Sequence, residues 1–278
     1  MSERLESKDL LRAIGEGPDH GFDIAKAALH LAALKRTRPE LSPFEDHLVR
    51  LGEDVSDALS VDSGRSLEAA VGTLARVLAQ DHRYCGDDQT YDDLQNADLI
   101  HVIERRKGLP VALGILYLHA ARAQGWTAYG LNFPGHFLIA VDRQGERAIL
   151  DPFHSGCSRT PPELRELLKM VAGQDAELNA EMYAPVPDRA VLLRLQSNIQ
   201  LRLLQMKQYE QAANIIESML LIAPQQSSLW RDFGLLQAQQ GNLTAAIEAL
   251  QASLVRESND VRRQETAALL EDLRRRMN

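Results

Sequence analysis

The residues of this sequence best suited to chemistry are a histidine and an aspartate. His136 follows Pro134-Gly135 in the segment FPGHFLIAV, and Asp151 ends the segment ILD, just before Pro152. An imidazole oriented by a carboxylate can act as a general base or hold a ligand through a fixed hydrogen bond. The structural alternative is a buried histidine whose ring nitrogens are satisfied by Asp151 and a backbone group.

The cysteines offer few candidates for a nucleophile that would act with this pair. The 278 residues include two, Cys85 and Cys157. The acidic neighbours of Cys85 disfavour a reactive thiolate. Cys157 follows Asp151 by six residues and could fold back toward it. We expect both cysteines to be ordinary packing or loop residues.

The most apolar segment of the chain precedes His136 and Asp151 and must position them. VALGILYLHAARAQG follows Pro110, which suits the first turn of a helix, and it ends at Gly125. It has almost no polar face, so we expect a central, buried helix. Two or three strands should follow, TAYGLNF, HFLIAVD and RAILDPF, with a hairpin turn before the last. His136 is expected at the first position of a strand.

Helices are expected before this core as well. Apolar positions repeat with helical spacing over residues 22–35, again after Pro43, and again after Ser66, which suits an N-cap. The segment DHRYCGDDQTYDDLQNA is expected to be an ordered loop that leads into a short helix.

The C-terminal part has a repeat of 34 residues that pairs Ala212 with Ala246 and Ile216 with Leu250. This part resembles tetratricopeptide repeats, helical hairpins that stack into a peptide-binding groove. We therefore predict an α+β fold. Residues 1–182 form a mostly helical region with a central helix and a small antiparallel sheet, and residues 183–278 form an all-α repeat domain.

Composition argues against several classes of function. The net charge of −8 lacks the basic field that binds nucleic acid. No apolar run reaches roughly 18 residues, and the N-terminus is polar. We therefore expect a cytoplasmic protein without membrane contact. The histidines show no HExxH spacing, and the acidic cluster at residues 87–93 shows no EF-hand spacing. We expect no metal site and no cofactor.

Nearly the whole chain resembles the SirB1 family of bacterial proteins, which has a transglutaminase-like, papain-type core. The matching stretches are FDIAKAALHLAALKRTRPEL, YDDLQNADLIHVIERRKGLPVALGILYLHAARAQG, GLNFPGHFLIAV and LDPFHSG, with the repeats behind them. In the wider transglutaminase-like superfamily a cysteine stands at the start of the central helix, a histidine on the next strand and an orienting aspartate on the strand after it. The resemblance places the histidine at His136 and the aspartate at Asp151, whereas the SirB1 family itself commonly has proline at the cysteine position.

The resemblance places a proline where that cysteine would stand. Members of the transglutaminase-like superfamily typically read Gly-x-Cys at the helix start, with a second glycine seventeen residues after the first. Gly108 and Gly125 have this separation, so the cysteine position falls on Pro110. Ala97 and Ala112 replace residues that commonly carry hydroxyls. The ordinary Cys-His-Asp mechanism cannot run from Pro110.

Other residues near these motifs are candidates for binding. An arginine after Glu104 could hold a ligand carboxylate beside His136, or it could lie on a solvated helix end. Asn96 and Asn132 could cap turns or bind a ligand amide. The candidate binding residues are Asn96, Glu104, Arg105, Arg106, Asn132, Phe133 and Trp230.

Two hypotheses of function follow from the sequence. The first is a non-catalytic transglutaminase-like domain joined to a repeat domain, which together bind a peptide or protein as an adaptor or regulator. The second is an amide hydrolase or acyl-transferase in which His136 and Asp151 activate water or a nucleophile from elsewhere. Pro110 favours the first hypothesis, and the pairing of His136 with Asp151 supports the second.

Overall fold

The structure, a computed structural model, describes residues 2–61 and 66–277. Contacts divide the chain into two compact units. The first unit contains Asp19–Leu195, and the second contains Leu5–Pro18 together with Gln196–Asn278. The predicted fold class, mixed helix and small antiparallel sheet followed by a helical repeat region, is confirmed. The predicted domain boundary between residues 182 and 183 stays a prediction. The compact units defined by contacts have different bounds.

Of the α-helices described in the first unit, α2 to α6 lie at or near the segments that the sequence predicts, and α7 follows them. The N-caps are visible: the side chain of Asp23 accepts from the first turn of α2, and Ser66 accepts from the N–H of Ala69 in α4. The helices are α2 (Ile24–Ala33), α3 (Ser42–Val61), α4 (Leu67–Arg76), α5 (Leu99–Arg105), α6 (Pro110–Ala123) and α7 (Pro161–Ala172).

Short elements lie within and on either side of the predicted loop at residues 81–97. A π-helical turn covers Val77–Asp81, a 3-10 turn covers Leu94–Ala97, and two short parallel strands pair, β1 (Cys85–Gly86) with β2 (Lys107–Gly108). Since β2 leads directly into α6, this pairing fixes the start of the central helix.

The larger sheet is antiparallel with the strand order β6-β5-β4-β3-β7. The hairpin between β4 and β5 turns at Gln144 and Gly145, both at positive φ, as a tight two-residue turn requires. The strands are β3 (Thr127–Leu131), β4 (Ile139–Arg143), β5 (Glu146–Asp151), β6 (Cys157–Ser158) and β7 (Pro185–Val186).

The prediction that His136 is the first residue of a strand is wrong, because β4 begins at Ile139. Pro134, Gly135 and His136 form a bend, with Gly135 in the left-handed region at φ +69°. That bend delays regular pairing with β3 until Ile139 lies opposite Gly130. His136 therefore stands on the approach to the strand.

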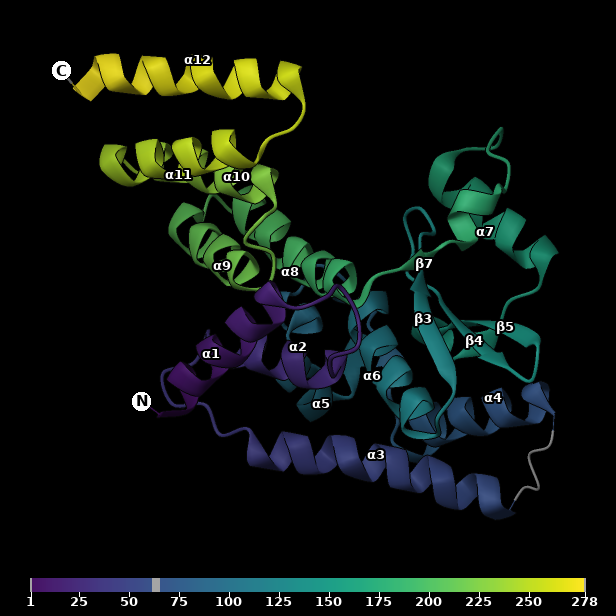
Figure 1. The fold of residues 1–278 in the computed structure, drawn as a ribbon. Coiled ribbons are helices and arrows are strands. Elements are labelled where there is room, and N and C mark those ends of the chain that lie inside the picture. The colour runs from purple at the N-terminus through teal and green to yellow at the C-terminus, as the bar shows by residue number, and fades with distance from the viewer. Residues whose placement is uncertain (1, 62–65, 278) are drawn as a thin grey trace. The chain divides into compact units, whose positions relative to one another are not determined.

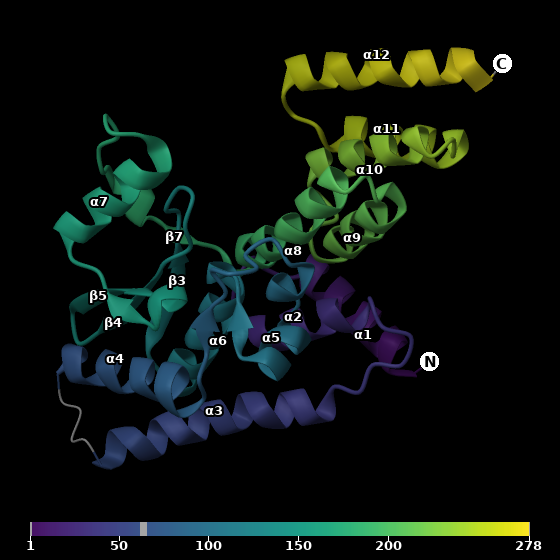
Figure 2. The same cartoon turned by 180° about the vertical axis from the view of Figure 1, so that it is seen from behind.

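Two helices cover opposite faces of the sheet. Ile139 faces α6, where a Cβ built on Gly114 would lie 3.6 Å from the Ile139 side chain. Leu138 and Ala140 share a buried cluster with Leu164 and Leu168 of α7. Figures 1 and 2 show α6 and α7 on opposite sides of β3. The first half of β4 is thus buried on both faces, which accounts for its continuous apolar run.

The second unit consists of helical hairpins. It contains most of α1 (Ser2–Glu16), the C-terminal part of α8 (Asp188–Gln205), α9 (Tyr209–Ile222), α10 (Ser227–Gln239), α11 (Leu243–Arg256) and α12 (Asp260–Met277). In Figures 1 and 2, α10 lies between α9 and α11, and α12 lies along α11. Gly234 allows α10 to approach Ala246 and Leu250 of α11 closely. None of the helices that the structure describes is long and apolar enough to cross a membrane.

Candidate functional site

His136 and Asp151 are in contact. Nε2 of His136 lies 2.9 Å from Oδ1 of Asp151, and the residues are 9% and 0% exposed. The register of the sheet explains the contact: Ile139 of β4 pairs with Leu150 of β5, so the bend before β4 lies beside the end of β5. With Nε2 held by the carboxylate, Nδ1 is the ring nitrogen left to exchange a proton or bind a ligand.

Asp151 also binds two residues that sequence reasoning missed. Oδ2 of Asp151 lies 2.8 Å from Nδ1 of His154 and accepts from Nη2 and Nε of Arg159 at 2.8 and 3.1 Å. Burial raises the pKa of Asp151, but hydrogen bonds from His136, Arg159 and His154 outweigh burial and hold it well below its ordinary value. Asp151 is therefore a carboxylate at neutral pH. Proximity to Asp151 along the chain is the one sequence signal for these two partners.

Aromatic and cationic side chains surround His136. The Phe153 ring stands edge-on to the imidazole with centroids 6.1 Å apart, and Tyr91 packs edge-on against Phe153 at 5.9 Å. Arg194 donates to the backbone carbonyl of His136 at 2.9 Å. No local pattern in the sequence could reveal Arg194, because it lies in α8, fifty-eight residues further along the chain.

Pro110 is the first residue of α6, as predicted. Phe153 connects this helix start to His136: a Cβ on Gly86 of β1 would lie 2.6 Å from the Phe153 ring, and β1 pairs with β2 just before Pro110. Within residues 2–61 and 66–277, Asp151 is the one side-chain hydrogen-bond partner of the His136 ring. No hydroxyl or thiol of these residues hydrogen-bonds to it.

The two thiols occupy settings that do not favour a nucleophile. Sγ of Cys85 donates weakly to the carbonyl of Arg106 at 3.8 Å. Cys157 is exposed and pairs opposite Asp151 across β5 and β6. Partial desolvation raises the pKa of Cys157, and the charge of Arg159 opposes that shift only in part. A raised thiol pKa leaves little thiolate at neutral pH.

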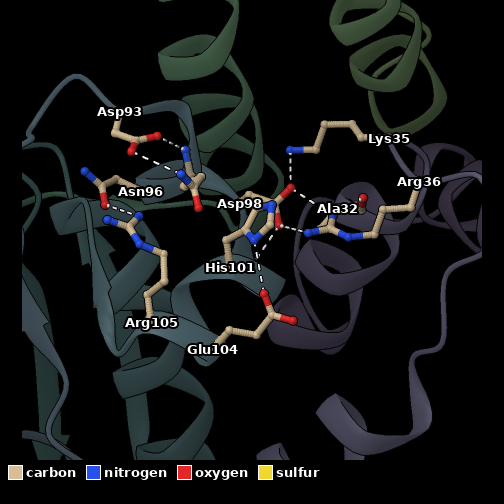
Figure 3. A network of polar contacts seen from close by, with 10 residues as sticks. Ala32, Lys35, Arg36, Asp93, Asn96, Asp98, His101, Glu104 and Arg105 are labelled. Carbon is tan, nitrogen blue, oxygen red and sulfur yellow. Dashed lines mark hydrogen bonds and ion pairs between the residues drawn. The ribbon is translucent and has the colours of Figure 1, made fainter.

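Two of the candidate binding residues, Asn96 and Arg105, form an internal network. Arg105 donates to Oδ1 of Asn96 and to Oδ2 of Asp87, each at 3.0 Å, and Asn96 donates to the carbonyl of Thr90 at 2.7 Å. Figure 3 shows the pairing of Asn96 and Arg105. The carbonyl of Asn96 also accepts from the N–H of Leu109, the N-cap of α6. The network thus anchors the turn that starts α6.

A second cluster anchors the same turn. Arg106 has a positive φ of 60°. Its Nη1 donates to the hydroxyl of Tyr84 at 2.6 Å and lies 2.7 Å from Nε2 of His47. Burial and the Arg106 charge lower the pKa of His47 to about 4, so His47 is neutral and accepts from Arg106. Glu104 lies at the surface beside His101, 3.1 Å away. Figure 3 includes this pair, next to Asp98 and its partners Lys35 and Arg36.

The remaining candidates have separate settings. The Asn132 side chain is exposed, while its N–H donates to the carbonyl of Ala184 at 3.1 Å. Phe133 is buried in the cluster beneath α7. Trp230 belongs to the second unit, where Nε1 donates to the carbonyl of Pro224 at 2.8 Å and Arg256 lies over the ring.

Two family profiles match the chain. The profile described as the transglutaminase-like superfamily matches residues 43–197, and one described as tetratricopeptide repeat matches residues 199–278. The first includes Pro110, His136 and Asp151, and the second includes α9 to α12.

Curated relatives include proteins named "UPF0162 protein". That of Xylella fastidiosa strain Temecula1 is 31% identical over 182 residues, which cover 64% of this chain and 65% of the relative. That of Vibrio cholerae is 28% identical over 225 residues, 80% of this chain and 82% of the relative. "F-box only protein 21" of Homo sapiens is 30% identical over 131 residues, 44% of this chain and 20% of the relative. The chain spans 65% and 62% of the length of the two Xylella relatives.

Proposed function

The chain belongs to the transglutaminase-like superfamily, and on this premise we propose that it is a peptide- or protein-binding adaptor or regulator of the SirB1 type. The observation that carries this proposal is Pro110 at the first position of α6. A helix start stabilises a thiolate through its dipole, and a proline there has neither a thiol nor an N–H group. His136 and Asp151 then serve as a fixed polar contact for a ligand.

The repeat unit supports a binding role through its exposed apolar residues. Leu201 of α8 and Leu235 of α10 are 57% and 39% exposed, and they stand thirty-four residues apart, at the same position of successive repeats. Equivalent positions on the corresponding helices of successive repeats line one surface of a repeat stack. Two leucines on such a surface suit the apolar side of a bound peptide.

Changing these leucines tests the adaptor role. We expect Leu201→Ser with Leu235→Ser to abolish capture of the proteins that the intact chain retains in a crosslinking pull-down. Both side chains are exposed, so the fold should persist, as circular dichroism can verify. Val255→Ser is the matched control, because Val255 is an 82% exposed apolar residue on α11. Equal capture by the double variant would count against binding through this surface.

A second candidate function is supported by the contact between His136 and Asp151. A carboxylate 2.9 Å from Nε2 orients the imidazole as a general base requires, which keeps amide hydrolysis or acyl transfer open with water or a nucleophile from elsewhere. The test is labelling of the full chain with thiol- and serine-reactive amide probes. Labelling that His136→Ala removes and His101→Ala keeps would establish this function in place of the adaptor. Unlabelled protein supports the adaptor.

A further inference from the structure

We propose that His136, Asp151 and His154 form a binding site for a divalent late first-row transition-metal ion such as zinc. This inference goes beyond the adaptor role, and it contradicts the expectation from sequence spacing that the chain has no metal site. The three residues are separated in sequence in a pattern that matches no zinc motif. They meet because the bend before β4 and the turn after β5 converge.

The ligand atoms already lie close together. One ring nitrogen from each histidine and one carboxylate oxygen of Asp151 all lie within 4.8 Å of one another. Zinc binds nitrogen and oxygen at about 2.0–2.2 Å, which places tetrahedral ligand atoms about 3.3 Å apart. The side chain of His154 is half exposed, so its ring has room to rotate and close the remaining distance.

Binding of the ion would replace two hydrogen bonds to the carboxylate. Nε2 of His136 and Nδ1 of His154 each face an oxygen of Asp151, at 2.9 and 2.8 Å. For each neutral imidazole, the proton moves to the other ring nitrogen and the freed lone pair binds the metal. The carboxylate donates an oxygen lone pair, so no proton is lost and no oxidation occurs.

Arg159 has two opposing effects on this site. It donates to Oδ2 of Asp151 through Nη2 and Nε, so Oδ1, which contacts Nε2 of His136 and the backbone N–H of His154, is the oxygen that would bind the ion. Ligating carboxylates in metal sites are commonly hydrogen-bonded in this way, and the bond fixes their orientation. The guanidinium also places a positive charge near the ion, so we expect weaker binding than at a site without it.

The ligand set selects the class of ion. Two imidazoles with one carboxylate match zinc and its late first-row neighbours, while magnesium and calcium prefer oxygen ligands alone. Asp151 and His136 are buried, whereas His154 provides an entry path from solvent. Three protein ligands leave a fourth position for water or for a group on a bound partner.

Isothermal titration of the full chain with Zn²⁺, after removal of metal by a chelator, tests the site. We expect one ion per chain, no comparable heat with Mg²⁺, and at least a tenfold loss of zinc affinity in His154→Gln. His154 lies at the surface, so this change spares the fold. Co²⁺ bound to the intact chain should show the visible absorption typical of four-coordinate Co²⁺. The variant should not show this absorption. His136→Gln should weaken both signals as well.

Two matched controls define the outcome. His101→Gln changes another histidine that pairs with an acidic residue three positions away, and it should leave zinc affinity unchanged. Cys157→Ser tests whether the exposed thiol captures the ion, and it should also have no effect. Zinc affinity that survives His154→Gln, or that disappears with Cys157→Ser, would overturn the proposal. Partner capture is measured separately, so this result leaves the adaptor role standing or falling by its own test.

Discussion

At the scale of single residues, Asp151 connects the other side chains of the candidate site. Its two oxygens contact His136, His154 and Arg159, and the residue is fully buried. A buried carboxylate with this many donors is stable as the ion and costly to neutralise. The orientation of both imidazoles therefore depends on one negative charge.

Asp151→Asn tests this dependence. We expect urea unfolding at pH 7 to show a free energy of unfolding lower by about 2–4 kcal/mol, since the amide leaves Arg159 without its charge partner. The folded pKa of Asp151 lies below its unfolded value near 3.9, so its stabilisation is present above about pH 4 and is lost as the pH falls. The difference between the two proteins should therefore shrink in acid.

Asp142→Asn provides the comparison. Asp142 also pairs with an arginine, Arg147, but both side chains reach solvent. Pairs of this kind contribute about 0–1 kcal/mol. An equal effect of the two substitutions would show that burial of Asp151 adds nothing to its contacts.

His136, Asp151 and Pro110 could be identified from the sequence because each lies in a short motif. Their partners could not. Arg194 reaches the carbonyl of His136 from a distant helix, and no local pattern encodes that contact. Arg105 and Arg106 were predicted as binding candidates, but both guanidinium groups have internal partners. Which way a side chain points at a helix end depends on residues brought there by the fold.

At the scale of elements, the position of α6 depends on Gly114, which leaves room for the ring of Phe137. Gly114 faces the buried ring of Phe137, and a Cβ there would overlap that ring. The central helix was predictable because its apolar run is long and its ends carry proline and glycine. The start of β4 was not, because a bend at Gly135 interrupts a pattern that otherwise reads as continuous strand.

Gly114→Ala should destabilise the protein even though alanine favours helices. We expect the free energy of unfolding to fall by about 1–3 kcal/mol because the Cβ forces Phe137 to move. Gly72→Ala in α4 is the matched control, since no atom lies within 4 Å of its Cβ position. That change should stabilise by about 0.5–1 kcal/mol through helix propensity. Urea unfolding of both variants decides whether packing or propensity governs position 114.

At the scale of the whole molecule, the second unit is built from two separate stretches of chain. The repeat period predicts its C-terminal stretch, whereas α1 joins it through contacts made far along the sequence. Ser7 and Leu11 of α1 are fully buried, and Gly15 closely approaches the carbonyl of Leu221 in α9. Contacts of this kind leave no period in the sequence, so the repeat pattern does not predict that α1 packs with these helices.

Deletion of residues 1–18 should therefore loosen the repeats. We expect faster hydrogen exchange of backbone amides in α9, because the deletion uncovers its contacts with α1. Amides of β4 in the first unit should exchange at their original rate and serve as the internal reference. Unchanged protection in α9 would mean that α1 contributes nothing to the stability of the second unit.

The aromatic rings near the site have a consequence for how this protein can vary. Phe153 is seated on Gly86 and Phe137 on Gly114, each ring filling the place of an absent side chain. Neither member of such a couple can be exchanged alone without a clash or a void. During evolution the two positions of each couple must then change together. A larger residue can replace the glycine only if a smaller residue replaces the aromatic ring.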